Sequence, residues 1–296
     1  MFSVIPIQAL PPEEDASQQC YIDVLRMDKI HTVVSGNKWF KLTGYLQEAQ
    51  QKNFKTIATF GGAYSNHIVA AAYAAKMCGL SSVGIIRGEK PAMLSHTLKE
   101  ALSHNMKLIF VSRSEYRDKA QLRKVHDQDK AYYWIPEGGY GPLGVAGIAD
   151  MLKGIPYWDY THLVTAVGTG TTMAGLIRGA LPYQQIIGIP VLNNHNSIEA
   201  EIRALLGEKQ IKSTYQLLPD YTFGGYAKKT PALIDFMNNT YKTVKLPLDF
   251  VYTAKAFYGL KAYLQDADLA DDSRILFLHT GGLQGNQSLP PGTLCY

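Results

Sequence analysis

The sequence predicts an α/β protein built from two open, twisted, parallel-sheet domains, each a three-layer αβα arrangement. Short β-branched or apolar runs alternate with amphipathic segments of roughly 10 to 15 residues from Lys55 onward, which is the pattern of βαβ units. Several of the apolar runs end in glycine-rich turns, as strand-to-helix junctions commonly do. At 296 residues the chain is long enough for two such domains.

The first series of elements lies between Trp39 and Gly144. Its predicted strands are 56–60, 82–87, 107–112 and 131–136. Its predicted helices are 39–53, 66–78, 93–105 and 116–128. The second of these helices is alanine-rich and stops at Gly79, because alanine favours a helix and glycine ends one. This block has the size of a compact subdomain.

A second series of elements follows the first. Its predicted strands are 161–167, 185–190 and 275–278. Its predicted helices are 144–153, a helix that follows the stretch 168–172 and continues through 181, and then 197–206, 230–240 and 252–266. No short-period repeat and no low-complexity linker occurs along the chain. We therefore expect a small domain of residues 39–144 inserted into a larger domain of residues 1–38 and 145–296, with a ligand-binding cleft between them.

Bulk composition excludes several classes of protein. Apolar residues make up 46% of the chain and charged residues 18%, which is ordinary for a globular enzyme and unlike a disordered chain. The net charge of +4 comes from scattered residues without a basic run, so nucleic acid is not an expected partner. No apolar stretch approaches the roughly 20 residues that cross a bilayer. The N-terminus lacks the pattern of a signal peptide.

The three cysteines, Cys20, Cys78 and Cys295, are too few and too scattered for a disulfide framework or a zinc site. Reduced thiols are typical of the cytoplasm. We therefore expect a cytoplasmic protein with no metal site and no membrane partner. A homodimer is the oligomeric state considered, although no sequence feature indicates it.

One lysine stands at the start of a predicted helix, in the stretch Ser-Gly-Asn-Lys-Trp-Phe-Lys-Leu at 35–42. Lys38 follows a Gly-Asn turn, where the helix dipole favours anions rather than an ammonium group. That field, together with burial, lowers the pKa of an amine and makes it nucleophilic, as a Schiff-base lysine requires. Taken alone, a solvated first-turn lysine is the simpler explanation.

A glycine- and threonine-rich loop at 168–172 joins a predicted strand to a predicted helix. Glycines let backbone N–H groups approach a phosphate, hydroxyl groups add donors, and the helix N-terminus supplies a favourable dipole. The loop lacks the lysine of a Walker A motif, and Gly175 follows Gly170 by five residues rather than the three of a dinucleotide fingerprint. We expect a single phosphate monoester here; the alternative is a turn in which glycine is purely steric.

A second cluster begins with Gly61 and Gly62 at the end of a predicted strand and continues with Ser65-Asn66-His67 at the start of a helix. N–H donors at a helix start bind an anion such as a carboxylate, and Asn66 can also donate to a phenolic oxygen. The alternative is an ordinary helix cap by Ser65 or Asn66, with His67 as a satisfied polar residue.

The turn His279-Thr280-Gly281-Gly282 follows the last strongly apolar strand. Ligands of open parallel sheets bind at the carboxyl ends of strands, so this turn is expected to face the same crevice as the two loops above. Thr280 can hydrogen-bond a ring nitrogen, and the glycines admit a flat ring; the alternative is a simple strand-ending turn. Three such strand ends together with Lys38 indicate a phosphorylated aromatic aldehyde as the ligand.

Together these motifs resemble those of the 1-aminocyclopropane-1-carboxylate deaminase and D-cysteine desulfhydrase family, within the tryptophan-synthase-β-like (fold type II) pyridoxal-phosphate enzymes. The family's Gly-Asn-Lys-x-x-Lys-Leu, Ser-Asn-His and phosphate-loop motifs are matched at 36–42, 65–67 and 168–172. Its Val-Tyr-x-x-Lys segment and the His-Thr-Gly-Gly of its desulfhydrase members are matched at 251–255 and 279–282. The likeness runs in order over most of the chain.

The resemblance implies pyridoxal 5'-phosphate as the cofactor, bound in the interdomain cleft mainly by the domain of residues 1–38 and 145–296. Lys38 is implied to hold it as a Schiff base and to move the substrate's Cα proton. The implied catalytic residues are Lys38, Tyr252 and Ser65. The implied cofactor-binding residues, besides Lys38, are Asn66, Gly168, Thr169, Gly170, Thr171, Thr172 and Thr280. The implied substrate-binding residues are Ser65, Asn66, His67, Tyr226 and Tyr252.

The resemblance also implies elimination of a β-substituent such as a thiol from a small amino acid, giving pyruvate and ammonia. The cyclopropane-opening deaminases have a second active-site tyrosine just before the final His-x-Gly-Gly, and Phe277 is the matching residue here. Ring opening of 1-aminocyclopropane-1-carboxylate to 2-oxobutanoate and ammonia is therefore the alternative. A further alternative is a non-catalytic phosphate- or nucleotide-binding α/β protein in which Lys38 is merely solvated.

Overall fold

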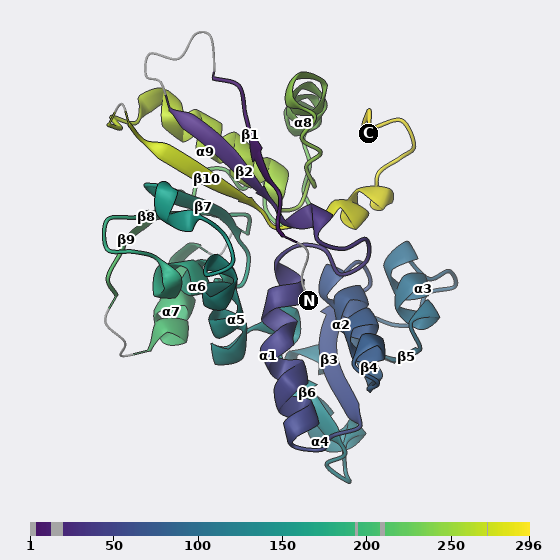
Figure 1. Cartoon of the computed structure of the whole chain (residues 1–296). Helices are drawn as coiled ribbons and strands as arrows, with labels where there is room; N and C mark the ends of the chain where they lie inside the picture. The colour runs from purple at the N-terminus through teal and green to yellow at the C-terminus, as the bar shows by residue number, and fades with distance from the viewer. Residues whose placement is uncertain (1–3, 13–19, 193–194, 208–210, 271) are drawn as a thin grey trace. The chain divides into compact units, whose positions relative to one another are not determined.

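The computed structural model describes residues 4–12, 20–192, 195–207, 211–270 and 272–296. The chain divides into two compact units, each with its own sheet (Figure 1). The larger unit comprises Met1–Asn37 and Ile148–Tyr296, and the smaller unit is Lys38–Gly147. That the larger unit is the cofactor-binding domain stays a prediction.

A six-stranded sheet forms the centre of the larger unit, in the order β1-β2-β10-β7-β8-β9. All neighbouring strands are parallel except β1 and β2, which pair antiparallel at one edge. The strands are β1 (Ile7–Ala9), β2 (Tyr21–Arg26), β7 (His162–Val167), β8 (Gln185–Pro190), β9 (Thr214–Leu217) and β10 (Arg274–His279). The predicted fold class is confirmed, although β1, β2 and β9 are not among the strands that the sequence pattern predicts.

Helices cover both faces of this sheet. They are α6 (Thr171–Gly179), α7 (His195–Leu206), α8 (Pro231–Val244), α9 (Thr253–Asp266) and the end of α5 (Pro142–Leu152). Both α6 and α9 contact β7 and β8. Because β7-α6-β8 and α9-β10 cross the sheet in opposite directions, right-handed crossovers place α6 and α9 on opposite faces. Phe257 on α9 and Phe277 on β10 lie in the apolar core between this helix and the sheet.

The smaller unit has a four-stranded, fully parallel sheet in the order β5-β4-β3-β6. Its strands are β3 (Thr56–Gly62), β4 (Ser81–Arg87), β5 (Met106–Val111) and β6 (Tyr132–Ile135). Its helices are α1 (Asn37–Gln51), α2 (Asn66–Met77), α3 (His96–Ser103), α4 (Lys119–His126) and the start of α5. Phe60 on β3 lies at the centre of one of its apolar clusters.

Two helices of the smaller unit begin later than the apolar pattern predicts, because a side chain caps each of them. Ser95 Oγ accepts a hydrogen bond from Leu98 N (3.2 Å), so α3 begins at His96. The Asp118 carboxylate accepts one from Gln121 N (2.9 Å), so α4 begins at Lys119. Such caps satisfy N–H groups that have no partner inside the helix.

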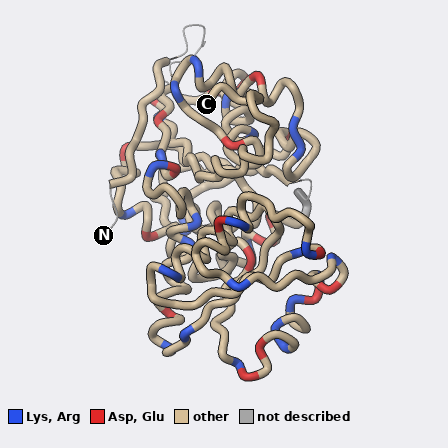
Figure 2. The backbone as a smooth tube through the Cα atoms, turned by 90° about the vertical axis from the view of Figure 1, so that its right-hand side faces the viewer, with Lys and Arg blue, Asp and Glu red and all other residues tan. Residues whose placement is uncertain are grey.

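Basic and acidic residues are interspersed in both units (Figure 2). In the described residues no helix has the length and apolar character needed to cross a membrane.

A close backbone contact in the larger unit precedes α1. Gly36 has φ +75°, and a Cβ on it would lie 1.9 Å from the carbonyl oxygen of Thr280. Gly281 takes part in the same contact, since a Cβ on it would lie 2.9 Å from the Gly36 Cα atom. Only glycine can occupy position 36 without displacing the Thr280 turn.

Gly36→Ala is expected to destabilise the protein more than Gly292→Ala, measured as the free energy of unfolding in denaturant. Gly292 also has a left-handed conformation (φ +80°), but nothing lies within 4 Å of a Cβ there. Gly292→Ala therefore carries only the backbone cost, about 1–2 kcal/mol. Gly36→Ala adds displacement of the turn, and a further loss of about 2 kcal/mol or more is expected. Equal losses in the two variants would contradict the close contact.

Candidate active site

Asn37 connects two of the turns that the sequence assigns to the site. Its backbone N–H donates to the Thr280 carbonyl oxygen (3.2 Å), and its Nδ2 atom donates to Thr172 Oγ1 (2.8 Å). The side chain is buried, with 8% of the residue exposed. The Thr172 hydroxyl accepts this bond and keeps its own proton for a second acceptor. Lys38 is the next residue of the chain, so this anchor fixes where its backbone begins.

Lys38 lies in the first turn of α1, and Lys41 lies one turn further along the same helix. Lys41 is only 3% exposed. Burial, together with the charge of Lys38, lowers the pKa of Lys41 well below its usual range. Among the described residues no carboxylate forms an ion pair with Lys41. A buried amine without a carboxylate partner, such as that of Lys41, is stabilised by a bound anion.

No role is assigned to Lys41 from the sequence, although its position in the motif at 36–42 is a signal for one. It is the second lysine of the same motif and is flanked by Phe40 and Leu42, both of which are buried. A cation between two buried apolar residues indicates burial of the cation itself.

Ser65 begins α2, but its hydroxyl does not cap the helix. The side-chain cap considered as an alternative for Ser65 is therefore not formed. Its Oγ atom lies instead beside Gly61, 2.9 Å from the position of a Cβ on that glycine. The next residue, Asn66, has an Oδ1 atom that is buried without a hydrogen-bond partner in the described part of the chain. A buried amide oxygen left unpaired is costly unless a ligand meets it.

The tautomer of His67 follows from its contact with Thr59. The Nε2 atom lies 2.8 Å from Thr59 Oγ1, and that hydroxyl donates its only proton to the Ile135 carbonyl oxygen (2.8 Å). Nε2 must therefore carry the ring proton and donate it to Thr59. Burial, together with the charges of Lys38 and Lys41, lowers the pKa of His67 to about 3. The ring is thus neutral, and its Nδ1 atom is a buried acceptor without a partner in the described residues.

The loop 168–172 connects β7 to α6 in the larger unit. Gly170 is its N-cap residue with φ +79°, and a Cβ on it would lie 2.9 Å from Ile202 Cγ1. The Oγ1 atoms of Thr169 and Thr171 share a hydrogen bond of 3.2 Å. Backbone N–H groups at the start of a helix in such a loop are the arrangement that binds phosphate.

Two tyrosines predicted to lie on the substrate side come together in the larger unit. The rings of Tyr226 and Tyr252 meet edge to face with centroids 6.3 Å apart. Tyr252 Cε1 lies 3.3 Å from the position of a Cβ on Gly168, so the pair stands at the start of the glycine-rich loop. Asp249 fixes this end of α9, because its carboxylate accepts hydrogen bonds from the backbone N–H groups of Tyr252 (2.9 Å) and Thr253 (2.8 Å).

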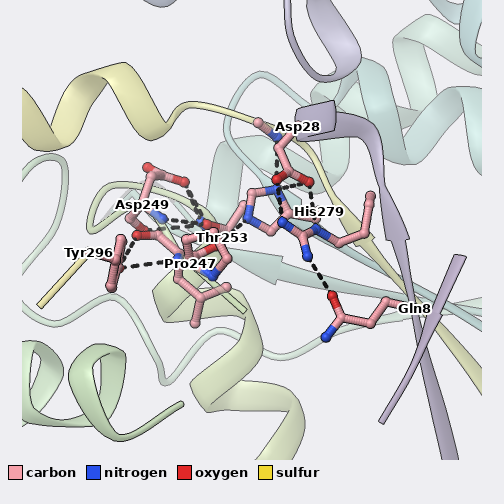
Figure 3. Close-up of polar contacts among 10 residues, drawn as sticks. Gln8, Asp28, Pro247, Asp249, Thr253, His279 and Tyr296 are labelled. Carbon is pink, nitrogen blue, oxygen red and sulfur yellow. Dashed lines mark hydrogen bonds and ion pairs between the residues drawn. The ribbon is translucent and has the colours of Figure 1, made fainter. Parts of the chain in front are cut away.

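His279 anchors the turn that carries Thr280 (Figure 3). Its Nε2 atom donates to the Pro247 carbonyl oxygen (2.7 Å), and its Nδ1 atom lies 3.3 Å from Asp28 Oδ1. Two hydrogen bonds from Arg26, of 2.8 and 2.6 Å, hold the Asp28 carboxylate. Burial raises the pKa of Asp28, but the bonds from Arg26 and the nearby His279 outweigh burial, and the pKa lies below its usual value.

Phe277, which stands where cyclopropane-opening deaminases have a tyrosine, packs into the core of the larger unit. It is fully buried on β10, and its ring centroid lies 5.0 Å from that of Phe257. A phenol at this position would need a hydrogen-bond partner within an apolar cluster. Phe277 therefore has a packing role that a tyrosine could not fill without rearrangement.

The chemistry of these residues fits pyridoxal phosphate. Lys38 offers the amine that its aldehyde requires, and the loop 168–172 offers N–H groups for its phosphate. Asn66 offers a side-chain amide at the start of α2. Amide oxygen and nitrogen are interchangeable by a flip of the side chain, so the unpaired end of Asn66 can meet either a donor or an acceptor. No group of three or more His, Cys, Asp or Glu side chains able to hold a metal ion occurs in the described residues.

The fold and these residues define an α/β enzyme of the pyridoxal-phosphate class. The sequence pattern of the pyridoxal-phosphate dependent enzyme family matches residues 16–281. The chain belongs to this family, and pyridoxal phosphate is its cofactor. The non-catalytic alternative is therefore set aside.

Known relatives are similar over nearly the whole chain. A Pyrococcus abyssi protein provisionally named 1-aminocyclopropane-1-carboxylate deaminase is 31% identical, over 95% of this chain and 89% of its own. The D-cysteine desulfhydrase of Salmonella newport is 28% identical, over 94% and 91%. A crystal structure described as that of an ACC deaminase homologue has a TM-score of 0.78 at 27% identity, over 96% and 91%. The predicted family and cofactor are thus confirmed, while the role of each site residue stays a prediction.

His67 is expected to make stability pH-dependent. The unfolded imidazole binds a proton below its ordinary pKa of about 6.5, whereas the folded one does so only near pH 3. Between these values the unfolded state holds more protons, so stability falls as the pH falls, by about 1.4 kcal/mol per pH unit from this group. Denaturant unfolding from pH 7 to pH 4 measures the slope. His67→Gln keeps a donor for Thr59 but does not titrate, so its slope should be smaller by that amount; parallel curves would contradict the neutral tautomer.

Proposed function

We propose that this enzyme eliminates the β-substituent of a small amino acid as a D-cysteine desulfhydrase does. D-Cysteine and water would then give pyruvate, ammonia and hydrogen sulfide. The observation that carries the proposal is the anchor at Asn37, which joins the Thr172 and Thr280 turns directly before Lys38. The name of the Salmonella relative supports the choice of substrate.

The cofactor's phosphate is proposed to bind the N–H groups of the loop 168–172, which makes the larger unit the main cofactor-binding domain. Thr280 is proposed to face the ring nitrogen as a neutral partner, and Asn66 to face the phenolic oxygen. Lys41 is proposed to contribute to anion binding, because its buried amine has no carboxylate partner in the described residues. A bound anion favours the charged form of Lys41.

Pyridoxal phosphate, when bound, supplies an electron sink for the carbanion that forms at the substrate's Cα atom. Lys38 would hold the cofactor through its Nζ atom, and the same atom would remove the proton from the substrate's Cα atom. Tyr252 Oη is proposed to protonate the departing sulfur, and Tyr226 to line the same side of the substrate. The ring of Tyr252 stands beside Gly168, and the ring of Tyr226 meets it edge to face.

The substrate carboxylate is proposed to bind Ser65 and Asn66 at the start of α2. The Ser65 hydroxyl, which does not cap the helix, can donate its proton to a carboxylate oxygen. His67 is proposed to act differently from its neighbours, because its ring proton is already donated to Thr59. Its Nδ1 atom can only accept a hydrogen bond, so His67 orients the loop rather than binding the carboxylate.

Opening of the cyclopropane ring is the second candidate, supported by the name of the Pyrococcus relative. It is disfavoured here because Phe277 has no hydroxyl and packs against Phe257 in the core. A cytoplasmic location is also proposed, since the three cysteines are free thiols.

The holoenzyme is expected to release pyruvate and hydrogen sulfide from D-cysteine and to release little 2-oxobutanoate from 1-aminocyclopropane-1-carboxylate. Lys38→Ala should lower kcat/KM for D-cysteine about 10³-fold, the usual contribution of a general base. Lys52→Ala is the matched control, because Lys52 follows α1 and its side chain is 56% exposed. Faster release of 2-oxobutanoate than of pyruvate would favour the deaminase instead. Full activity of Lys38→Ala would overturn the proposed role of Lys38.

A further inference from the structure

We propose that Lys255 is a positioning residue, whose buried amine holds the loop 222–227 so that Tyr226 is presented beside Tyr252. The inference rests on the proposed function, because it takes these two tyrosines to face the substrate. It assigns a role to a lysine that the chemistry above does not use.

Lys255 makes two hydrogen bonds to the backbone of this loop. Its Nζ atom donates to the carbonyl oxygens of Thr222 (2.8 Å) and Gly225 (2.6 Å). The residue is 0% exposed, which is rare for a lysine. Burial lowers the pKa of Lys255 to about 8, and the carboxylate of Asp249 acts in the opposite direction. The amine donates both bonds whether or not it is charged.

The position of Lys255 on α9 is unfavourable for the helix itself. It lies in the first turn, where the helix dipole disfavours a cation. Asp249 at the start of the helix and the two loop carbonyls offset this cost. Lys255 also follows Tyr252, the N-cap residue of the helix, by three residues. A buried lysine in the first turn of a helix is therefore explained by the two hydrogen bonds with which it holds the loop.

The loop needs an external support, because its backbone is unusual. Four residues between 222 and 227 have positive φ: Phe223 (50°), Gly224 (85°), Gly225 (105°) and Ala227 (53°). The two that are not glycine are strained in this conformation, and such conformations persist only when the surroundings enforce them. Lys255 supplies the polar part of that support.

An apolar contact supplies the rest. The ring of Phe223 in the loop meets the ring of Tyr258 edge to face, with centroids 4.9 Å apart. Tyr258 lies on α9, the helix that carries Lys255. Phe223 and Lys255 thus hold the loop at two points before Tyr226. The side chain of Tyr226 is left 48% exposed while its ring meets Tyr252. Release of the Lys255 bonds would remove the polar part of the support that places Tyr226.

Trypsin tests the loop support without any substrate. Lys228 and Lys229 are exposed and directly follow the loop. In the holoenzyme, Lys255→Met is expected to raise the cleavage rate after these lysines about tenfold or more over wild type, because both hydrogen bonds from Lys255 to the loop are lost. Lys261→Met is the matched control, because it removes another lysine from α9 and should leave the rate unchanged. An unchanged rate in Lys255→Met would overturn the proposal.

Steady-state kinetics with the amino acid that gives pyruvate test the link to Tyr226. Lys255→Met should raise KM about tenfold and change kcat little, because it misplaces a group that binds substrate. Tyr226→Ala should raise KM similarly, and the double variant should add nothing further, since Lys255 acts through Tyr226. Multiplying effects, or a fall in kcat with an unchanged KM, would overturn the proposal.

A variant that does not fold is recognised by cleavage throughout the chain. In that case Lys255→Gln carries the same tests, because its amide keeps a donor for the loop and smaller changes in the same direction are expected. If the wild-type enzyme releases no pyruvate from any amino acid, the proposed function fails. The cleavage ratio then still decides whether Lys255 holds the loop.

Discussion

The contact between Gly36 and the Thr280 turn is the constraint on which the rest of the site depends. It brings the segment before α1 against the carboxyl end of β10, so closely that any side chain at position 36 would displace the turn. Asn37 can then reach both the Thr280 carbonyl and the Thr172 hydroxyl. The start of α1, the glycine-rich loop and the last strand-ending turn are thereby tied to one residue, and Lys38 is the next one.

The buried polar groups of the larger unit support turns at the ends of strands and helices. Asp28 and His279 contact each other at the end of β10, and Asp249 accepts a hydrogen bond from Thr253 at the start of α9 (Figure 3). Lys255 holds the neighbouring loop. Each group is expensive to bury, and each is satisfied by the backbone or by an opposite charge. The apolar core provides stability, whereas these groups provide the geometry of the proposed site.

Much of the fold can be predicted from the sequence, because periodicity and glycine-rich turns are local signals. The strand 185–190 has the same bounds in the structure as in the pattern, and parallel sheets follow from the alternation of elements. Strands β1 and β9 span only three and four residues, too few for a periodic pattern. The burial of Lys255 and the tautomer of His67 depend on contacts between segments distant in sequence. No local pattern predicts those contacts, so the site residues are found more readily than their protonation and support.

The central claim is that Lys38, and not the buried lysine one turn away, carries the cofactor. Reduction of the holoenzyme with borohydride, followed by digestion and mass mapping, locates the lysine to which the pyridoxyl group becomes fixed. The account predicts a single modified peptide with the added mass on Lys38. The added mass on Lys41 or Lys255, or no fixed cofactor at all, would contradict it.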